Sequence, residues 1–423
     1  MLIEFSIENF RSIKNKVTLS MVATQDSSLE NNLINTDVLK EDKLLRSVAL
    51  YGANASGKTN VLFALNFLKA LVTKSHTYQK GTGIKFTPFK FDKEYQAKPT
   101  KFEVTFIKNN IKYVYGISFN KDRIIDEYLC YYPNDKKALI FERKDTNKYN
   151  FTIDKSLQKF ISERTLDNVL YLSKSTQEKY EKTSVAFDWF KDTLQVVGHT
   201  DHPALTDFTV KLLTKDQKLK DTILKALTVA DLGIEDISAS IKKLKIDDLP
   251  PDFPPEIKAL MMKGKNEIEQ TDIKIFHKMT NGKKVIPNTH LGFDEESEGT
   301  RRLFSLIGTW IDALSKGLIL VVDELDTKLH HRLNKFLIRL FHDPTQNKKN
   351  AQLIFTTHNI LLLEEENLFR RDQIWFTEKN PEFGSTDLYS LAEFGVRKDK
   401  NIKIGYITGR YGAFPFIKED KIF

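Results

Sequence analysis

Residues Gly52-Ala-Asn-Ala-Ser-Gly-Lys-Thr59 match the pattern G-x-x-x-x-G-K-[ST] of a loop that binds phosphate groups. Its glycines let the backbone bend so that N–H groups point inward at an anion. In this pattern Lys58 is expected to bridge the β- and γ-phosphates of a nucleotide, and Thr59 to hold Mg²⁺. The pattern predicts these nucleotide-binding residues: Gly52, Asn54, Ala55, Ser56, Gly57, Lys58, Thr59 and Asn60.

Two carboxylates follow an apolar run later in the chain. Residues 318–322 read Leu-Ile-Leu-Val-Val, and Asp323 and Glu324 come directly after them. Ligands bind at the carboxyl ends of parallel strands, where acids in these positions would be exposed. Asp323 is expected to organise Mg²⁺ and its water, and Glu324 to polarise an attacking water. The alternative is a buried strand that ends in a solvated acidic turn.

Two further polar sites flank these acids in the sequence. Ser297 and Gly299 precede a helix that begins near Thr300, and a hydroxyl and a glycine N–H at a helix start can bind an anion. Taken alone, they form only a helix N-cap. His358 follows the apolar run Leu353-Ile-Phe and could hydrogen-bond a γ-phosphate, although a lone histidine after a strand is usually a surface residue.

Hydrophobic periodicity predicts the elements that carry these residues. Residues 48–51 form a short buried strand before the phosphate loop, and a helix follows over 58–73. Residues 1–22 read as a β-hairpin and residues 101–143 as an antiparallel meander. Residues 151–270 look mainly helical, with segments near 155–166, 184–195, 216–229 and 254–270, and residues 297–380 alternate between helix and strand, as over a parallel sheet.

The predicted fold is therefore α/β, with an antiparallel meander, a parallel core sheet and a mainly helical insertion. We expect an N-terminal lobe over residues 1–150, the insertion over 151–271, and a C-terminal lobe over 272–423.

Composition narrows the class of protein. No apolar run approaches the roughly 20 residues that a membrane-spanning helix needs, so no contact with a membrane is expected. A single cysteine, Cys130, excludes disulfides within the chain, and we expect a cytoplasmic location. The formal net charge of +8 permits contact with nucleic acid, but many separate lysines are equally typical of a soluble surface.

Together these four sites resemble those of the ATP-binding cassette (ABC) superfamily, in particular its SMC/RecF-like branch. Residues Ile7-Glu-Asn-Phe-Arg-Ser-Ile13 are similar to the opening strand of that branch. The resemblance implies that ATP lies between two heads, so that Ser297 and Gly299 of one copy act on the nucleotide held by the other. It also implies that Asp326 belongs to the D-loop and that Arg11 reaches the nucleotide, although an exposed hairpin arginine is the alternative.

The C-terminal residues Tyr406-Ile-Thr-Gly-Arg-Tyr-Gly-Ala-Phe-Pro-Phe416 look like those of the AAA15/AAA21 group. This group includes the RloA, AbiL and PARIS AriA families of anti-phage defence ATPases. Two features depart from the superfamily pattern: residues 296–300 read Glu-Ser-Glu-Gly-Thr rather than Leu-Ser-Gly-Gly-Gln, and no glutamine is assigned to the Q-loop. Residues 151–270 match no family.

The resemblance implies a Mg²⁺-dependent ATPase that works as a homodimer or higher homo-oligomer. It would act as the sensor or scaffold subunit of an abortive-infection system and gate a separately encoded effector, such as a TOPRIM-like nuclease. DNA or a phage protein is the expected trigger. One alternative is a RecF-like DNA-binding repair ATPase. Another is an OLD-type ATPase-nuclease, but only 65 residues follow His358, and they hold no Glu…Asp-x-Asp arrangement.

Overall fold

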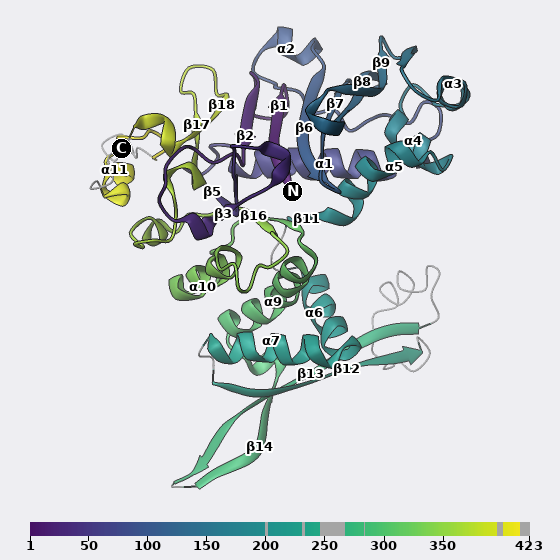
Figure 1. Ribbon diagram of the computed structural model, residues 1–423. Helices are drawn as coiled ribbons and strands as arrows, with labels where there is room; N and C mark the ends of the chain where they lie inside the picture. The colour runs from purple at the N-terminus through teal and green to yellow at the C-terminus, as the bar shows by residue number, and fades with distance from the viewer. Residues whose placement is uncertain (199–201, 231–232, 246–266, 283, 396–400, 415–423) are drawn as a thin grey trace, which may run out of the picture. The chain divides into compact units, whose positions relative to one another are not determined.

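The computed structural model describes residues 1–198, 202–230, 233–245, 267–282, 284–395 and 401–414 (Figure 1). The chain divides into two compact units. The first contains residues 1–198, 313–326 and 337–423, and the second contains residues 199–312 and 327–336. Within the described residues no helix is both long and apolar enough to cross a membrane.

An antiparallel sheet of seven strands forms one half of the first unit, with strand order β10-β9-β8-β7-β6-β1-β2. The predicted hairpin and meander are both part of it, so the two predictions are confirmed as one sheet. In chain order its strands are β1 (Leu2–Glu8), β2 (Val17–Ser20), β6 (Thr100–Lys108), β7 (Ile111–Phe119), β8 (Ile124–Tyr132), β9 (Ala138–Lys144) and β10 (Lys148–Phe151).

The second sheet of this unit is parallel except at one edge, and its strand order is β11-β15-β16-β5-β17-β18. Its central strands have no exposed residues, which is typical of a sheet covered on both faces. Its strands are β5 (Ser47–Tyr51), β11 (Leu194–Val197), β15 (Ile319–Val322), β16 (Gln352–Thr356), β17 (Ile374–Lys379) and β18 (Thr386–Ser390). A short pair, β3 (Leu33–Ile34) and β4 (Leu44–Leu45), completes the strands of this unit.

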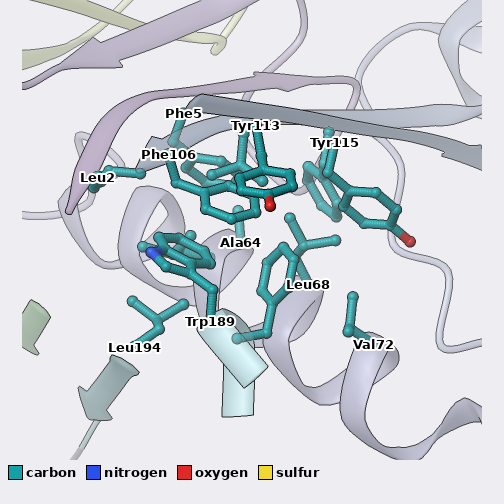
Figure 2. Close-up of a cluster of buried hydrophobic side chains, with 14 of the residues drawn as sticks. Leu2, Phe5, Ala64, Leu68, Val72, Phe106, Tyr113, Tyr115, Trp189 and Leu194 are labelled. Carbon is teal, nitrogen blue, oxygen red and sulfur yellow. The ribbon is translucent and has the colours of Figure 1, made fainter. Parts of the chain in front are cut away.

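Helix α1 (Lys58–Lys74) packs its apolar face into the core of the first unit. Phe67 lies 5.7 Å from Phe119 of the meander, measured between ring centroids. Figure 2 shows Ala64 and Leu68 of this helix near Trp189, whose indole stacks on Phe106 at 4.3 Å. This packing holds α1, the helix that follows the phosphate loop, against the hydrophobic core that the two sheets share.

Shorter helices line the rest of this unit: α2 (Lys93–Ala97), α3 (Lys155–Ser162), α4 (Tyr171–Gln177), α5 (Glu181–Asp188) and α11 (Ile402–Ile407). The helix predicted near 184–195 ends earlier than expected. A π-helical turn covers Trp189–Thr193, and Leu194 already belongs to β11, which pairs in parallel with β15.

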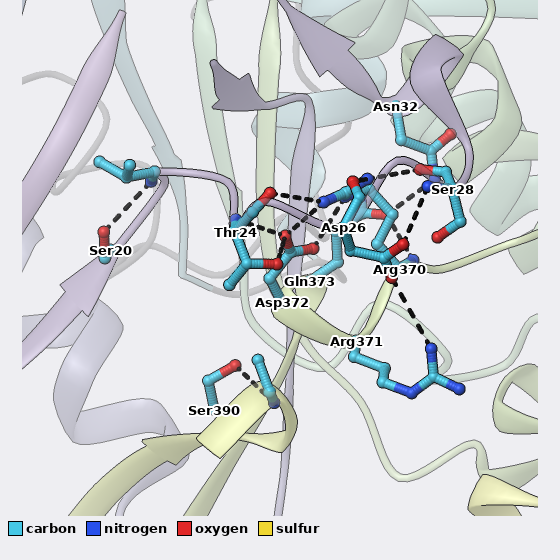
Figure 3. Close-up of polar contacts among 12 residues, drawn as sticks. Ser20, Thr24, Asp26, Ser28, Asn32, Arg370, Arg371, Asp372, Gln373 and Ser390 are labelled. Carbon is cyan, nitrogen blue, oxygen red and sulfur yellow. Dashed lines mark hydrogen bonds and ion pairs between the residues drawn. The ribbon is translucent and has the colours of Figure 1, made fainter. Parts of the chain in front are cut away.

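A buried ion pair fixes the loop before β3 beside the start of β17 (Figure 3). The guanidinium of Arg370 donates to both carboxylate oxygens of Asp372, at 3.0 and 2.7 Å. It also donates to the backbone carbonyls of Thr24, Asp26 and Ser28. Because this guanidinium is buried and each nitrogen has a partner, removing Asp372 would leave an uncompensated buried charge.

The second unit contains α6 (Pro203–Lys215), α7 (Gln217–Val229) and a sheet of β12 (Ile234–Lys245), β13 (Glu267–Asn281) and β14 (Lys284–Gly292). Helix α9 (Glu298–Lys316) begins in this unit, and α10 (His331–His342) spans the boundary with the first. The helix predicted near 254–270 lies mostly outside the described residues. Its last four positions belong to β13, where they pair with β12.

The mixed α/β architecture with its meander and parallel core sheet confirms the predicted fold class. The predicted boundaries at 150/151 and 271/272 stay a prediction.

Candidate functional site

The phosphate loop connects β5 to α1 as predicted. Gly57 has a φ of 113°, a left-handed conformation that favours glycine, and it directly precedes the first residue of α1. Asn54 and Ala55 are exposed at the top of the loop, whereas Ser56 is buried. The loop therefore presents its backbone at the start of a helix, where the helix dipole favours an anion.

Lys58 folds back across this loop. Its ammonium donates to the carbonyl oxygens of Gly52 at 2.7 Å and Ala53 at 3.1 Å. Burial lowers the pKa of Lys58 to about 8, and the carboxylates of Asp323, Glu324 and Asp326 partly oppose that shift. The side chain thus carries a partly desolvated positive charge that an anionic ligand would stabilise.

Two threonines of the β17–β18 hairpin form hydrogen bonds with the phosphate loop. They were not identified from the sequence. The hydroxyls of Thr377 and Ser56 are 2.6 Å apart. Thr386 donates to the carbonyl oxygen of Ser56 at 2.8 Å, although the two residues are 330 positions apart in the chain. No local signal in the sequence indicates such contacts, because they depend on β17 pairing with β5.

The carboxylates predicted to follow β15 lie next to the phosphate loop. The hydroxyl of Thr59 donates to Asp323 Oδ1 at 3.2 Å, so the two predicted Mg²⁺ ligands are neighbours. Mg²⁺ is usually held by one or two carboxylates together with substrate phosphates and water. Among the described residues no group of three or more His, Cys, Asp or Glu side chains could hold a metal. One hydroxyl and one carboxylate, as in Thr59 and Asp323, are a ligand set that fits a magnesium ion arriving with nucleotide phosphates.

Glu324 lies next to Asp323 and is exposed. Its backbone has a φ of 51°, which is uncommon for a residue other than glycine. Its amide N–H donates to the hydroxyl of Thr356 at 2.7 Å. The residue with this unusual conformation is thus hydrogen-bonded to the neighbouring strand β16.

His358 and Asp326 also lie at this edge of the sheet. The backbone N–H of His358 is 3.2 and 3.3 Å from the two carboxylate oxygens of Asp326. Burial and the nearby charge of Lys58 lower the pKa of the His358 imidazole, and the carboxylates of Asp326, Glu324 and Asp323 partly oppose the shift. This shift favours the neutral imidazole, which can donate one hydrogen bond from one ring nitrogen and accept one at the other.

Arg11 lies against the first turn of α1. Its guanidinium donates to Asn60 Oδ1 at 3.1 Å, and its central carbon is 3.6 Å from the ring centroid of Phe63. The Asn60 amide in turn donates to Ser12 Oγ at 2.7 Å. These contacts place Arg11 beside the residue that follows Thr59, and its contact with a nucleotide stays a prediction.

Ser297 and Gly299 belong to the second compact unit, so their arrangement is described there. Ser297 is exposed, and its hydroxyl accepts a hydrogen bond from the Thr300 N–H at 3.1 Å, as an N-cap residue does. A β-carbon at Gly299 would meet no atom closer than 3.6 Å. The start of α9 is thus open to a ligand, and its action on a nucleotide held by another copy stays a prediction.

Comparison with known proteins identifies the family. The family described as "AAA domain, putative AbiEii toxin, Type IV TA system" matches residues 47–364, which include the phosphate loop, the Asp323-Glu324 pair and His358. The chain belongs to this AAA family. No curated protein matches the sequence.

Three solved structures are similar to this AAA family member. The SMC head domain from Thermotoga maritima is 14% identical, with a TM-score of 0.41, over 92% of this chain and 98% of that one. The SMC head bound to the C-winged helix domain of ScpA is 15% identical, with a TM-score of 0.40, over 93% and 99%. The recombination mediator RecF with ATPrS is 13% identical, with a TM-score of 0.37, over 92% and 98%.

Proposed function

We propose that this member of the AAA family is a Mg²⁺-dependent ATPase that hydrolyses ATP to ADP and phosphate. The hydrogen bond between Thr59 and Asp323 carries this proposal, because it joins the phosphate loop to the carboxylates at the end of β15. The phosphate loop and Lys58 would bind the phosphates, and Thr59 and Asp323 would hold Mg²⁺, which supplies charge neutralisation during phosphoryl transfer. Glu324 would act as the general base, and His358 would hydrogen-bond the γ-phosphate.

A substitution at Glu324 tests this assignment. Glu324→Gln keeps the size of the side chain but cannot accept a proton from water, so we expect ATP to bind as in the wild type and turnover to fall by at least about a hundredfold. The measurement is steady-state phosphate release together with binding of a fluorescent ATP analogue. Glu364→Gln is a matched control, because Glu364 is exposed and pairs with Lys403 outside the site. Hydrolysis by Glu324→Gln at the wild-type rate would show that another residue is the base.

We further propose that two chains meet head to head, so that Ser297 and Gly299 of one complete the ATP site of the other. The position of the exposed Ser297 and the half-buried Gly299 at the start of α9 supports this proposal, since a β-carbon on Gly299 would meet no atom closer than 3.6 Å. Asp326, which follows the site carboxylates, would lie near the contact between the two copies. ATP would close the dimer, and hydrolysis would reopen it.

The output of this cycle would be the gating of a separate effector in an anti-phage, abortive-infection system in the cytoplasm. The family description, which names a toxin of a Type IV toxin–antitoxin system, supports this context. The effector would be a TOPRIM-like nuclease, and DNA or a phage protein would be the trigger. Phage plaque counts on cells expressing this gene with its neighbouring reading frame test the proposal. Equal protection by the wild type and Glu324→Gln would contradict it.

A further inference from the structure

The hydroxyl of Thr356 lies between the two carboxylate residues of the site. Thr356 is the last residue of β16, and its side chain has no exposed surface. Its Oγ1 donates to Asp323 Oδ1 at 2.6 Å and accepts from the Glu324 N–H at 2.7 Å. One buried hydroxyl therefore contacts both the predicted metal ligand and the backbone of the predicted base.

The proton count fixes the direction of these two bonds. A threonine hydroxyl has one proton to donate and two lone pairs that accept. The Glu324 amide can only donate, so the hydroxyl proton is left for the carboxylate of Asp323. A bond from a hydroxyl to a carboxylate is charge-assisted and is stronger than a bond between neutral groups. The two hydrogen bonds of this hydroxyl therefore have only one possible orientation.

A second contact from the same residue holds the turn after β15. The carbonyl oxygen of Thr356 accepts a hydrogen bond from the Leu325 N–H at 3.1 Å. Between these two amides lies the left-handed conformation of Glu324, with a φ of 51°. Strained backbone of this kind persists only where surrounding contacts determine it. Thr356 supplies two of those contacts, one from its side chain and one from its backbone.

The position of Thr356 along the chain connects this turn to His358. The parallel pairing of Val322 with Phe355 brings Asp323 opposite Thr356, and His358 follows two residues later. The carboxylate of Asp326 accepts from the His358 N–H. Hydrogen bonds thus connect the turn at 323–326 to the residues at and just after the end of β16. They involve Asp323, Glu324, Leu325 and Asp326 of the turn.

We propose that Thr356 is a positioning residue for this reaction: its hydroxyl orients Asp323 for the metal and fixes the backbone that carries Glu324. This inference rests on the proposed ATPase function. It predicts that removal of the hydroxyl raises the Mg²⁺ concentration needed for half-maximal activity and slows turnover. The affinity for ATP without metal should be unchanged. Thr356 touches neither ATP nor water in this proposal, so its effect passes through Asp323 and Glu324.

Three variants test the proposal. Thr356→Val keeps the shape of the side chain and removes both side-chain hydrogen bonds. Thr356→Ser keeps the hydroxyl. Thr309→Val is the matched control, because Thr309 is a buried threonine in α9 whose hydroxyl has no hydrogen-bond partner among the described residues. Thr356→Ala takes the place of Thr356→Val if the valine variant does not fold, as judged by circular dichroism.

For Thr356→Val we expect kcat to fall by about tenfold or more, with KM for ATP within about threefold of wild type. The Mg²⁺ concentration for half-maximal activity should rise several-fold. In a second measurement, a fluorescent ATP analogue should bind equally in EDTA, and the gain in affinity on adding Mg²⁺ should be smaller than in the wild type. Thr356→Ser and Thr309→Val should resemble the wild type in both measurements.

Three outcomes would overturn the proposal. Thr356→Val could match the wild type in turnover and in Mg²⁺-dependent binding. The kcat of Thr356→Ser could fall as far as that of Thr356→Val, which would indicate a role for the methyl group in packing. Affinity in EDTA could fall as much as affinity with Mg²⁺, which would indicate general damage to the site. A wild-type chain that hydrolyses no ATP would instead contradict the proposed function, and the binding measurement would still test the role of Thr356.

Discussion

The side chain of Thr386 fills the space beside Gly57 in the phosphate loop. A β-carbon built on Gly57 would overlap the Thr386 hydroxyl oxygen and would lie 2.9 Å from Thr386 Cβ. Thr386 cannot easily move away, because its hydroxyl donates to the Ser56 carbonyl at 2.8 Å and its N–H donates to the Ser12 carbonyl at 2.8 Å. Gly57 is therefore required by a neighbouring strand as well as by its own φ of 113°.

We predict that Gly57→Ala weakens ATP binding by at least about tenfold, since either the loop or the start of β18 must shift. Binding of a fluorescent ATP analogue measures the loss. Gly81→Ala is the matched control: Gly81 also has a positive φ, of 83°, but a β-carbon there meets no atom within 4 Å. Both variants have the same kind of backbone strain, so equal affinities for the two would contradict a steric role for Thr386.

The positions of several candidate site residues could be predicted from the sequence, because these residues lie next to the ends of elements that have a strong local signal. The apolar runs before Gly52 and Asp323 are buried strands, and the helix predicted over 58–73 is α1. Such runs, flanked by glycine or by acids, are visible without knowledge of the fold. The order of these motifs along the chain then indicated which edge of the sheet they share.

Contacts between elements that are distant in the chain could not be predicted from the sequence in the same way. Thr356 was part of a predicted strand end, but its partners lie 32 and 33 positions earlier in the chain. Their meeting depends on the register in which β15 pairs with β16. One signal was available: both strands end in polar residues, and equal register would bring Asp323 opposite Thr356.

Strand β12 shows how local periodicity can mislead. Ile234, Ile237, Ile241 and Leu244 recur at spacings of three and four, which is typical of a helix. In the structure these residues form a strand that pairs with β13, and the pairing register shifts between Ile234 and Asp236. A shift of this kind allows both Ile234 and Ile237 to be buried although they are three residues apart.

The lowered pKa of Lys58 predicts that ATP binding takes up a proton. Burial lowers this pKa to about 8 in the protein without ligand, so above pH 8 the amine is mostly neutral. Phosphates favour the charged form and raise the pKa on binding, so affinity should fall as pH rises through 8. At pH 8.5 we expect uptake of about 0.8 proton per ATP.

Calorimetric titration at pH 8.5 in two buffers with different enthalpies of ionisation measures this uptake. In Lys58→Arg the guanidinium remains charged at this pH, so the variant should show no uptake at that position. Equal binding enthalpies for the wild type in the two buffers would mean that Lys58 is already protonated before ATP binds.

Mixing two inactive variants tests whether Ser297 acts on the nucleotide of another copy. Lys58→Ala removes the phosphate-loop cation. Ser297→Asp keeps an acceptor for the Thr300 N–H, and so keeps the N-cap of α9, but it places a negative charge where a phosphate would bind. We expect each variant alone to be nearly inactive, and Ser297→Thr, which keeps the hydroxyl, to be active.

In a two-fold symmetric dimer, a mixed pair of these variants contains one site with both changes and one site with neither. Random pairing makes half of the dimers mixed, so an equal mixture should recover about a quarter of the wild-type ATPase rate. Recovery should rise with protein concentration, because it depends on association between two chains. If Ser297 instead served the ATP site of its own chain, every site in the mixture would carry one change and no activity would return.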